Sequence, residues 1–320
     1  MKYSMSEFDC FFISYDEPQK EEFWAHLQNI APWAQRIDGV RGFDSAHKRA
    51  AELSQTERFI TVDGDTLTSP EFFELEIDIP EKFKDCVLSW NSHNAINGLC
   101  YGNGGLKCWT RDFVLGMRTH EAASTGAETV DFCWDARYLQ LNNSYSTTCP
   151  NASPFQAWRA GFREGVKMTL DRGIRVCAGQ LTQAVHARNL RRLLVWTSVG
   201  ADVENGLWAV YGARCGVAAA NIESTFDLAQ ISDYEWFKNY FYTEIAPQFS
   251  GDGSQRCRRT GQLWEPALVH AASSALIEPV ARQTGLLMVD LGAEQSAWFK
   301  RAAESVEQRR DPLACETAAP

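Results

Sequence analysis

The sequence predicts an α/β protein with a mostly parallel sheet flanked by helices, followed by a mainly helical C-terminal region. Two observations support this fold class. In about the first 60 residues, short apolar strands alternate with amphipathic helices, an order typical of a right-handed parallel layer. From about residue 178, apolar residues recur at helical spacing instead. We therefore expect a first domain over residues 1–175, a helical region over 176–310 and a tail over 311–320.

The first layer can be assigned element by element. A strand over 10–13 ends in the polar turn Ser14, Tyr15, Asp16 and Glu17, and a helix over 20–30 follows. A short strand over 34–40 leads to Arg41, and a helix that carries His47 runs to residue 53. A buried strand over 59–62 closes the layer. Parallel strands would gather their polar ends at one edge of the sheet, where α/β proteins bind ligands.

The strand over 59–62 ends in Asp63-Gly-Asp65. Two carboxylates at a sheet edge suit Mg²⁺ or Mn²⁺ held together with a diphosphate, because these ions take few protein ligands and keep waters and phosphate oxygens. A turn rich in aspartate, with Gly64 supplying its backbone conformation, is the alternative. Arg41 and His47 at the same edge would suit phosphate, or they could simply face water.

Two further stretches carry candidate site residues. Four glycines between residues 98 and 105, including Gly104 and Gly105, precede Lys107 and a strand over 106–109. Such a loop lets backbone approach a phosphate or sugar, or it is a plain hairpin. The strand-like run 130–135 holds Asp131 and Asp135, either of which could be a general base or a surface carboxylate.

The C-terminal half begins with the best-defined helix, from the cap Ser153 to Gly173. Arg159, Arg163 and Lys167 recur every four residues on it, so one face is basic. This face is either solvated or an anion site. Further helices are expected over 181–196, 206–220, from a capping box at 232–235, over 264–283 and over 292–310.

Composition sets limits on function. The chain has 320 residues, 45% of them hydrophobic, and a net charge of -10. It has no apolar run near the roughly 18 residues that span a bilayer and no signal-peptide pattern, and its ten cysteines lack zinc spacing. We expect a cytoplasmic protein with reduced cysteines and no membrane partner. The acidic total opposes nucleic-acid binding by bulk charge, so a nucleic-acid site would need a local basic face.

The order of these motifs resembles glycosyltransferases of the GT-A fold. More narrowly, it is similar to the phage glycosyltransferases associated with TET/JBP-type base-oxidising enzymes. The resemblance covers roughly residues 8–245. The main segments that carry it are Phe12-Ile-Ser-Tyr-Asp-Glu-Pro18, Gly39-Val-Arg-Gly42 with Ala46-His47, Val62-Asp-Gly-Asp65, Tyr101-Gly-Asn-Gly-Gly-Leu-Lys107 and Trp158-Arg-Ala-Gly-Phe-Arg-Glu164.

The resemblance implies transfer of a sugar from a nucleotide diphosphate, most simply a UDP-sugar, to the hydroxyl of 5-hydroxymethylpyrimidine in DNA, with 5-hydroxymethylcytosine the first choice. It implies that Ser14 to Glu17 hold base and ribose, and that Arg41 and His47 approach ribose or diphosphate. Asp63 and Asp65 would bind ribose and metal, and Gly104, Gly105 and Lys107 would line the sugar pocket. Asp131 would be the catalytic base, with Asp65 as the catalytic metal ligand. The predicted acceptor-DNA contacts are Trp158, Arg159, Arg163 and Lys167. A phage enzyme would work in the host cytoplasm.

Two other functions remain open. A glycosyltransferase of this fold could instead modify a glycan, a protein or a small molecule, which the acidic net charge favours. A module of the same fold that has lost catalysis could serve as a binding or structural protein, although the pair of aspartates speaks against this.

Overall fold

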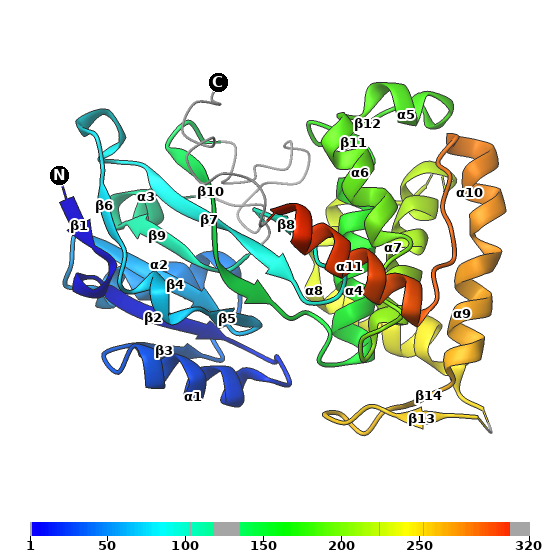
Figure 1. Cartoon of the computed structure of the whole chain (residues 1–320), viewed down its shortest axis with the longest axis horizontal. Helices are drawn as coiled ribbons and strands as arrows, with labels where there is room; N and C mark the ends of the chain where they lie inside the picture. Colours follow the sequence, from blue (N-terminus) through cyan, green and yellow to red (C-terminus); the bar gives the residue numbers. More distant parts are fainter. Residues whose placement is uncertain (1, 103, 118–134, 224, 252, 308–320) are drawn as a thin grey trace. The chain divides into compact units, whose positions relative to one another are not determined.

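The computed structural model describes residues 2–102, 104–117, 135–223, 225–251 and 253–307 (Figure 1). It divides the chain into two compact units. The first comprises Met1–Ala95 and Cys100–Cys149, and the second comprises Ile96–Leu99 and Pro150–Pro320. The boundary predicted from the sequence is later, at residue 175. The helix that follows Ser153 therefore belongs to the second unit.

The first unit is built on an eight-stranded sheet of order β3-β2-β4-β9-β7-β10-β5, with β8 paired to β7. The strands are β2 (Asp9–Ser14), β3 (Gln35–Asp38), β4 (Arg58–Asp63), β5 (Thr66–Thr68), β7 (Val87–Asn94), β8 (Cys100–Tyr101), β9 (Lys107–Thr110) and β10 (Tyr138–Thr148). The predicted parallel layer is confirmed, since β2 pairs in parallel with both β3 and β4. The sheet as a whole is mixed and not mostly parallel, because β9 runs antiparallel to β4 and β7, and β5 antiparallel to β10.

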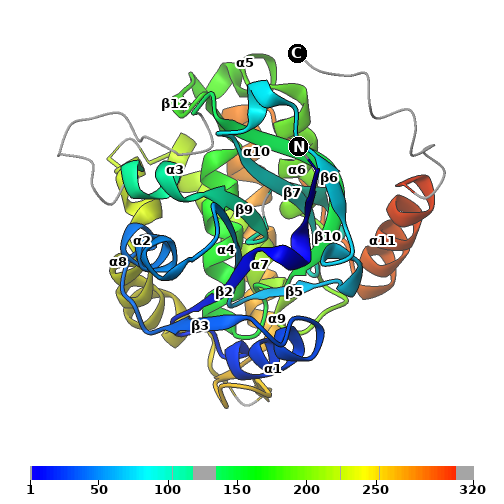
Figure 2. The same ribbon diagram turned by 90° about the vertical axis from the view of Figure 1, so that its left-hand side faces the viewer.

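Helices cover both faces of the β2–β4 region. The helices of this unit are α1 (Lys20–Ile30), α2 (Phe43–Leu53) and α3 (Arg111–Gly116). Successive residues of β2 point to opposite faces, so Phe12 packs in one core cluster with α1 and Phe11 packs in another with α2. Figure 2 shows α1 and α2 on these two sides. A separate two-stranded sheet pairs β1 (Lys2–Ser4) with β6 (Glu76–Asp78), and short 3-10 helices span Met5–Glu7, Pro70–Phe72 and Glu81–Phe83.

The second unit contains helices and two hairpins. The helices are α4 (Pro154–Lys167), α5 (Leu181–Ala184), α6 (Ala187–Trp196), α7 (Gly206–Asn221), α8 (Tyr234–Tyr240), α9 (Pro266–Ala275), α10 (Ile277–Thr284) and α11 (Ala293–Glu307). The hairpins pair β11 (Leu170–Asp171) with β12 (Ile174–Arg175), and β13 (Gln255–Arg256) with β14 (Leu263–Trp264). Short 3-10 helices span Ala178–Gln180, Leu228–Ser232 and Ala246–Phe249, and a π-helical turn spans Phe241–Ile245.

Four predicted helix boundaries are wrong. The single helix expected over 264–283 is divided into α9 and α10. Helix α4 starts after Ser153, as expected, but ends at Lys167, and Gly173 instead occupies the β11–β12 turn with φ 83°. The helix expected over 181–196 is broken, because His186 leaves the helical conformation and its ring accepts a hydrogen bond from the Arg188 amide at 3.2 Å. The cap of α8 is Asp233, whose carboxylate accepts two backbone amides, and not the residue before it.

The α4–α7 pair is packed through glycines on both helices. A Cβ added at Gly161 or Gly165 would overlap the backbone carbonyl of α7, at Ala209 and Ala213 respectively. A Cβ at Gly212 of α7 would overlap a carbonyl of α4 in the same way. Backbone cannot rotate aside as a side chain can, so this close approach requires glycine.

A buried arginine ties α7 to the segment before α11. The Arg214 side chain is fully buried. Its guanidinium donates to Asp290 Oδ1 at 2.7 Å and to the carbonyls of Thr197 and Val289 at 2.8 and 2.9 Å. Ser274 donates to the other oxygen of Asp290 at 2.7 Å. Although burial acts to raise the pKa of Asp290, these hydrogen bonds and the charge of Arg214 hold that pKa below its usual value.

No helix in the described part of the chain has both the length and the apolar character needed to cross a membrane.

Candidate functional site

Polar side chains converge at one edge of the first unit's sheet. Because β2, β3 and β4 are parallel, their last residues, Ser14, Asp38 and Asp63, stand side by side: Ser14 pairs with Asp38, and Ile13 pairs with Asp63. The antiparallel strand β9 starts at the same edge, with Lys107 opposite Thr61. The structure thus brings the predicted polar turn, the Asp-Gly-Asp turn and the lysine after the glycine loop to one place.

Glu17 lies over the Asp-Gly-Asp turn. Its Oε2 accepts a hydrogen bond from the Tyr15 amide at 2.7 Å, which folds the side chain back across the sheet edge. A Cβ added at Gly64 would be 2.7 Å from the same oxygen, so the glycine makes room for the carboxylate. Burial raises the pKa of Glu17, backbone hydrogen bonds oppose this rise, and the charges of Asp65 and Asp16 add to it.

Asp63 lies between the glycine loop and Lys107. A Cβ added at Gly105 would overlap the Asp63 side chain, so the loop backbone rests directly against it. Burial raises the pKa of Asp63 to about 6, the charge of Glu17 adds to the rise, and Lys107 opposes it. The Lys107 ammonium is buried and donates to the Gly104 carbonyl oxygen at 2.6 Å.

Asp65, the second acid of the turn, is half-buried. Its carbonyl oxygen accepts the Cys149 amide at 2.8 Å, and the Thr66 hydroxyl donates to its carboxylate at 3.3 Å. The turn is therefore held to the end of β10 by its backbone, which fixes the position of Asp65.

His47 is buried within α2. Its ring stacks on Phe43 with centroids 3.8 Å apart and meets the edge of Trp109 at 5.2 Å. Burial lowers the pKa of His47 to about 3, and the nearby charge of Lys107 adds to this effect. The imidazole is therefore neutral at physiological pH, and its Nδ1–H donates to the Phe43 carbonyl at 2.9 Å. Arg41, just before this helix, is exposed.

Asp38 is a site residue that the sequence analysis did not single out. Its Oδ1 accepts hydrogen bonds from the Ser14 hydroxyl and the Lys20 ammonium, each at 2.7 Å. Arg36, which forms a bidentate pair with Glu21, also contacts this oxygen at 3.4 Å. Burial acts to raise the pKa of Asp38, but the donors from Lys20 and Ser14 hold it below its usual value. The sequence carried little signal for it, because Asp38 lies inside the strand predicted over 34–40 and ends the strand only in the structure.

Several predicted residues lie elsewhere. The proposed base Asp131 is outside the described residues. Asp135, its alternative, pairs with Arg137 at 2.9 Å on the approach to β10. Trp158, Arg159, Arg163 and Lys167 all belong to the second unit. Trp158 is fully buried among the aromatic rings of α4 and α8, so its ring offers no face for stacking on a base, and its predicted contact with DNA is wrong for this structure.

The donor set at the sheet edge suits a hard cation. Asp63, Asp65 and Glu17 supply carboxylate oxygens, which Mg²⁺ and Mn²⁺ prefer. Burial is the main cause of the raised pKa values of Asp63 and Glu17, and the smaller contribution from neighbouring carboxylates is one that a cation would offset. Among the described residues, however, no group of three or more His, Cys, Asp or Glu side chains is arranged to hold a metal ion by itself. A metal at this edge would therefore need oxygens from a bound ligand as well.

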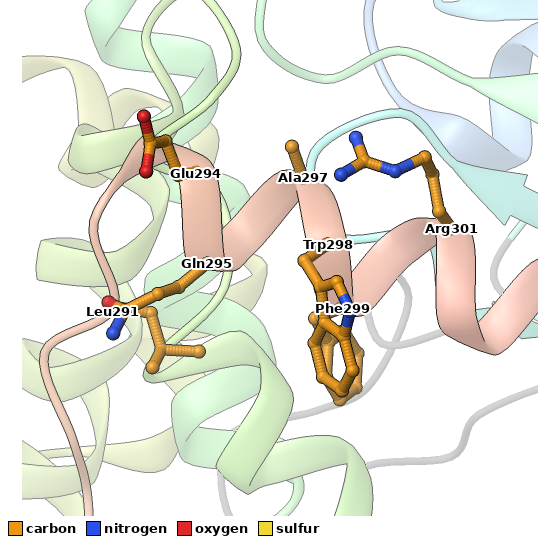
Figure 3. Close-up of a pocket in the computed structure, with 7 residues that line it drawn as sticks. All are labelled: Leu291, Glu294, Gln295, Ala297, Trp298, Phe299 and Arg301. Atoms are coloured by element: carbon orange, nitrogen blue, oxygen red, sulfur yellow. The ribbon is translucent and has the colours of Figure 1, made fainter.

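The second unit has a pocket beside α11, lined by Leu291, Glu294, Gln295, Ala297, Trp298, Phe299 and Arg301 (Figure 3). Its lining is largely apolar and contains no cluster of catalytic side chains, so it is not the candidate site.

Comparison of the sequence with models of known protein families and with curated proteins finds no match.

Proposed function

We propose that the protein is a metal-dependent glycosyltransferase that moves a sugar from a nucleotide diphosphate to the hydroxyl of a 5-hydroxymethylpyrimidine in DNA. The main support is the Asp63-Gly-Asp65 turn, which lies at the ends of parallel strands with Glu17 over it and the Gly105 backbone against it. The resemblance of the motif order to GT-A glycosyltransferases supplies the reaction, and the finer GT-A assignment of the fold is part of this proposal.

The carboxylates define the diphosphate end of the proposed site. Asp65 and Asp63 would bind Mn²⁺ or Mg²⁺ together with the diphosphate oxygens, as the small number of protein ligands requires. The metal, when bound, offsets the charge that builds up on the departing diphosphate. Because Asp63 must be ionised to take part, its raised pKa of about 6 predicts that metal affinity falls as the pH drops below that value.

Lys107 and His47 would contact the sugar nucleotide in different ways. The Lys107 ammonium has three N–H groups, of which one donates to the Gly104 carbonyl oxygen. The others can donate to a phosphate or a sugar hydroxyl. His47 is held neutral by burial, so it can position a donor group by hydrogen bonding but carries no charge to the phosphates. The polar turn from Ser14 to Glu17 and Asp38 would accept hydrogen bonds from the ribose or base.

The acceptor step has a simple balance. The bond between the sugar's anomeric carbon and the diphosphate oxygen breaks, and a bond to the acceptor hydroxyl oxygen forms. The hydroxyl proton passes to a base, for which Asp131 remains the proposed residue. The modified pyrimidine must be out of the helical stack for its hydroxymethyl group to reach the sugar.

The test is mass analysis of nucleosides after DNA containing 5-hydroxymethylcytosine is incubated with the full chain, Mn²⁺ or Mg²⁺ and a panel of sugar nucleotides. We expect a mass gain of one sugar that needs the metal and disappears in Asp65→Asn. Asp85→Asn removes an exposed carboxylate outside the site and should behave as wild type. Turnover by Asp65→Asn at the wild-type rate would contradict the metal assignment.

A glycosyltransferase acting on a glycan, a protein or a small molecule is the second candidate. The net charge of -10 favours it, because most of the surface would repel DNA. Metal-dependent hydrolysis of the sugar nucleotide, with no mass gain on any hydroxymethylated DNA, would support this candidate over the first. Absence of both activities would favour a non-catalytic module.

A further inference from the structure

A row of aromatic and arginine side chains runs over α4, α8 and the π-helical turn Phe241–Ile245 in the second unit. Tyr234 and Tyr242 are 45% and 46% exposed, unusually much for large aromatic residues. The Arg159 guanidinium lies 4.6 Å from the Tyr234 ring centre and 5.3 Å from that of Phe155. Arg163 lies 5.6 Å from the Tyr234 ring and donates to its hydroxyl at 3.3 Å, while Tyr242 packs on Phe155 at 5.6 Å. We call these five residues the Tyr–Arg track.

The cations of the track and its surroundings lack internal counter-ions. Arg159 and Arg163, together with exposed Lys167 on α4 and exposed Lys238 on α8, form no ion pair with any residue that the structure describes. Lys238 follows Tyr234 by one helical turn and precedes Tyr242 by another, so it stands between the two rings. Acids lie on the same elements, among them Glu164, Asp233 and Glu235, but among the described residues none of these four cations is neutralised by an ion pair, so they can contact an anionic partner.

Aromatic faces combined with free cations match one class of ligand well. Bases of any sequence stack on such rings, and the cations contact the phosphates between them. Residues 234 to 242 run through α8 into the π-helical turn, and the helical rise over this stretch is about 12 Å. This corresponds to three or four steps of a stacked strand at about 3.4 Å each. A double helix offers only groove edges and backbone to the protein, since its base faces are covered by neighbouring bases.

We propose that the Tyr–Arg track binds single-stranded DNA, with bases stacked on Tyr234 and Tyr242 and the backbone held by Arg159, Arg163 and the flanking lysines. The inference rests on the proposed function in one respect: it takes the acceptor to be DNA and states that the acceptor strand is engaged unpaired. It replaces buried Trp158 with two exposed tyrosines as the base-contacting side chains.

The test is fluorescence anisotropy with the full chain and a short labelled oligonucleotide of unmodified DNA, without sugar nucleotide or metal. We expect the single strand to bind more tightly than the same strand annealed into a duplex. Tyr234→Ala and Tyr242→Ala should each weaken single-strand binding by about 5- to 100-fold, the usual effect of removing a stacking ring. Tyr234→Phe keeps the ring and should bind close to wild type.

Further variants test the charged contacts with the strand and serve as controls for folding. Lys238→Gln should lower the slope of log affinity against log salt by about 0.7, the contribution of one phosphate contact on a single strand. Arg188→Gln removes an exposed cation on α6 outside the track and should leave the slope unchanged. Trp298→Ala removes an exposed aromatic ring of α11 and should leave single-strand affinity unchanged, while thermal unfolding confirms that each variant is folded.

Two results would overturn the proposal: duplex binding as tight as single-strand binding, or both tyrosine-to-alanine variants binding as wild type. Binding is measured without turnover, so its outcome is independent of the transferase test. Normal binding with no sugar transfer would refute the proposed function and leave the track standing. Sugar transfer by wild type, together with wild-type DNA binding by both tyrosine-to-alanine variants, would support the proposed function and refute the role of the track.

Discussion

Replacing Asp63 with asparagine should stabilise the protein while removing the proposed activity. Burial and the charge of Glu17 make the ionised carboxylate unfavourable, and they raise its pKa from 3.8 to about 6. At about 1.4 kcal/mol per pKa unit, the ionised form weakens folding by at most about 3 kcal/mol. Asparagine keeps the shape and removes the charge, so Asp63→Asn should gain part of that amount near neutral pH.

The stability difference between Asp63→Asn and wild type should depend on pH. A carboxyl whose pKa is raised on folding binds its proton more tightly in the folded state, so its contribution to stability is present at low pH and is lost as the pH rises through the window from 3.8 to about 6. The stability gain of Asp63→Asn over wild type should therefore be largest above about pH 6 and nearly absent below about pH 4.

Urea unfolding of both proteins at several pH values measures this difference. Asp38→Asn is the matched control, because it removes the same charge from the same sheet edge, but from a carboxyl whose pKa is lowered by Lys20 and Ser14 despite its burial. It should not stabilise the protein. Mn²⁺ with sugar nucleotide should raise the unfolding midpoint of wild type and not that of Asp63→Asn. Equal stability of wild type and Asp63→Asn at about pH 8, or a gain independent of pH, would show that the ionised Asp63 carboxylate does not destabilise the fold.

Three further changes test other parts of the structure. Gly161→Ala should lower the free energy of unfolding by about 1–3 kcal/mol in urea, because its methyl group overlaps a backbone carbonyl of α7, whereas Gly179→Ala, with open space around it, should have little effect. Asp290→Asn should lower the free energy of unfolding by about 3 kcal/mol, since it leaves the buried Arg214 guanidinium without its counter-ion. Because the pKa of Asp290 is lowered in the folded protein, the difference in urea midpoint between wild type and the variant should disappear as the pH falls. Gly105→Ala should abolish metal-dependent sugar transfer while far-UV circular dichroism stays unchanged, because its methyl group displaces the first acid of the Asp-Gly-Asp turn.

Local signals in the sequence were enough to predict the first layer of the sheet. The strand before Ser14, the helix over 20–30 and the strand before Asp63 are each fixed by an apolar run or a helical spacing, and all three are found where expected. The direction of β9 could not be predicted in this way. Whether the strand after the glycine loop runs parallel or antiparallel to β4 depends on pairing between distant residues, for which a single sequence carries no periodic signal.

The sequence was enough to predict the acidic residues of the Asp-Gly-Asp turn, but not the residues that surround them in the candidate site. Asp63 and Asp65 stand out because a glycine separates two carboxylates at a strand end. Asp38 was missed because one acid inside a short predicted strand looks like any surface residue until Lys20 is seen bound to it. The contact of Trp158 with DNA came from the resemblance, whereas its helical spacing with Phe155 and Phe162 places it on the apolar face of α4, where the structure buries it.

The path of the chain has a practical consequence for dissecting the protein. Residues 96–99 belong to the second unit although residues on both sides belong to the first, so the chain crosses between the units after Ala95, after Leu99 and after Cys149. Ile96 is completely buried, and its carbonyl oxygen accepts a hydrogen bond from Lys300 at 3.4 Å. A stop codon after Cys149 would thus leave residues 96–99 without the second unit to which they belong, and a second unit expressed from residue 150 would lack them. Gene fusions and two-hybrid baits should accordingly carry the chain undivided.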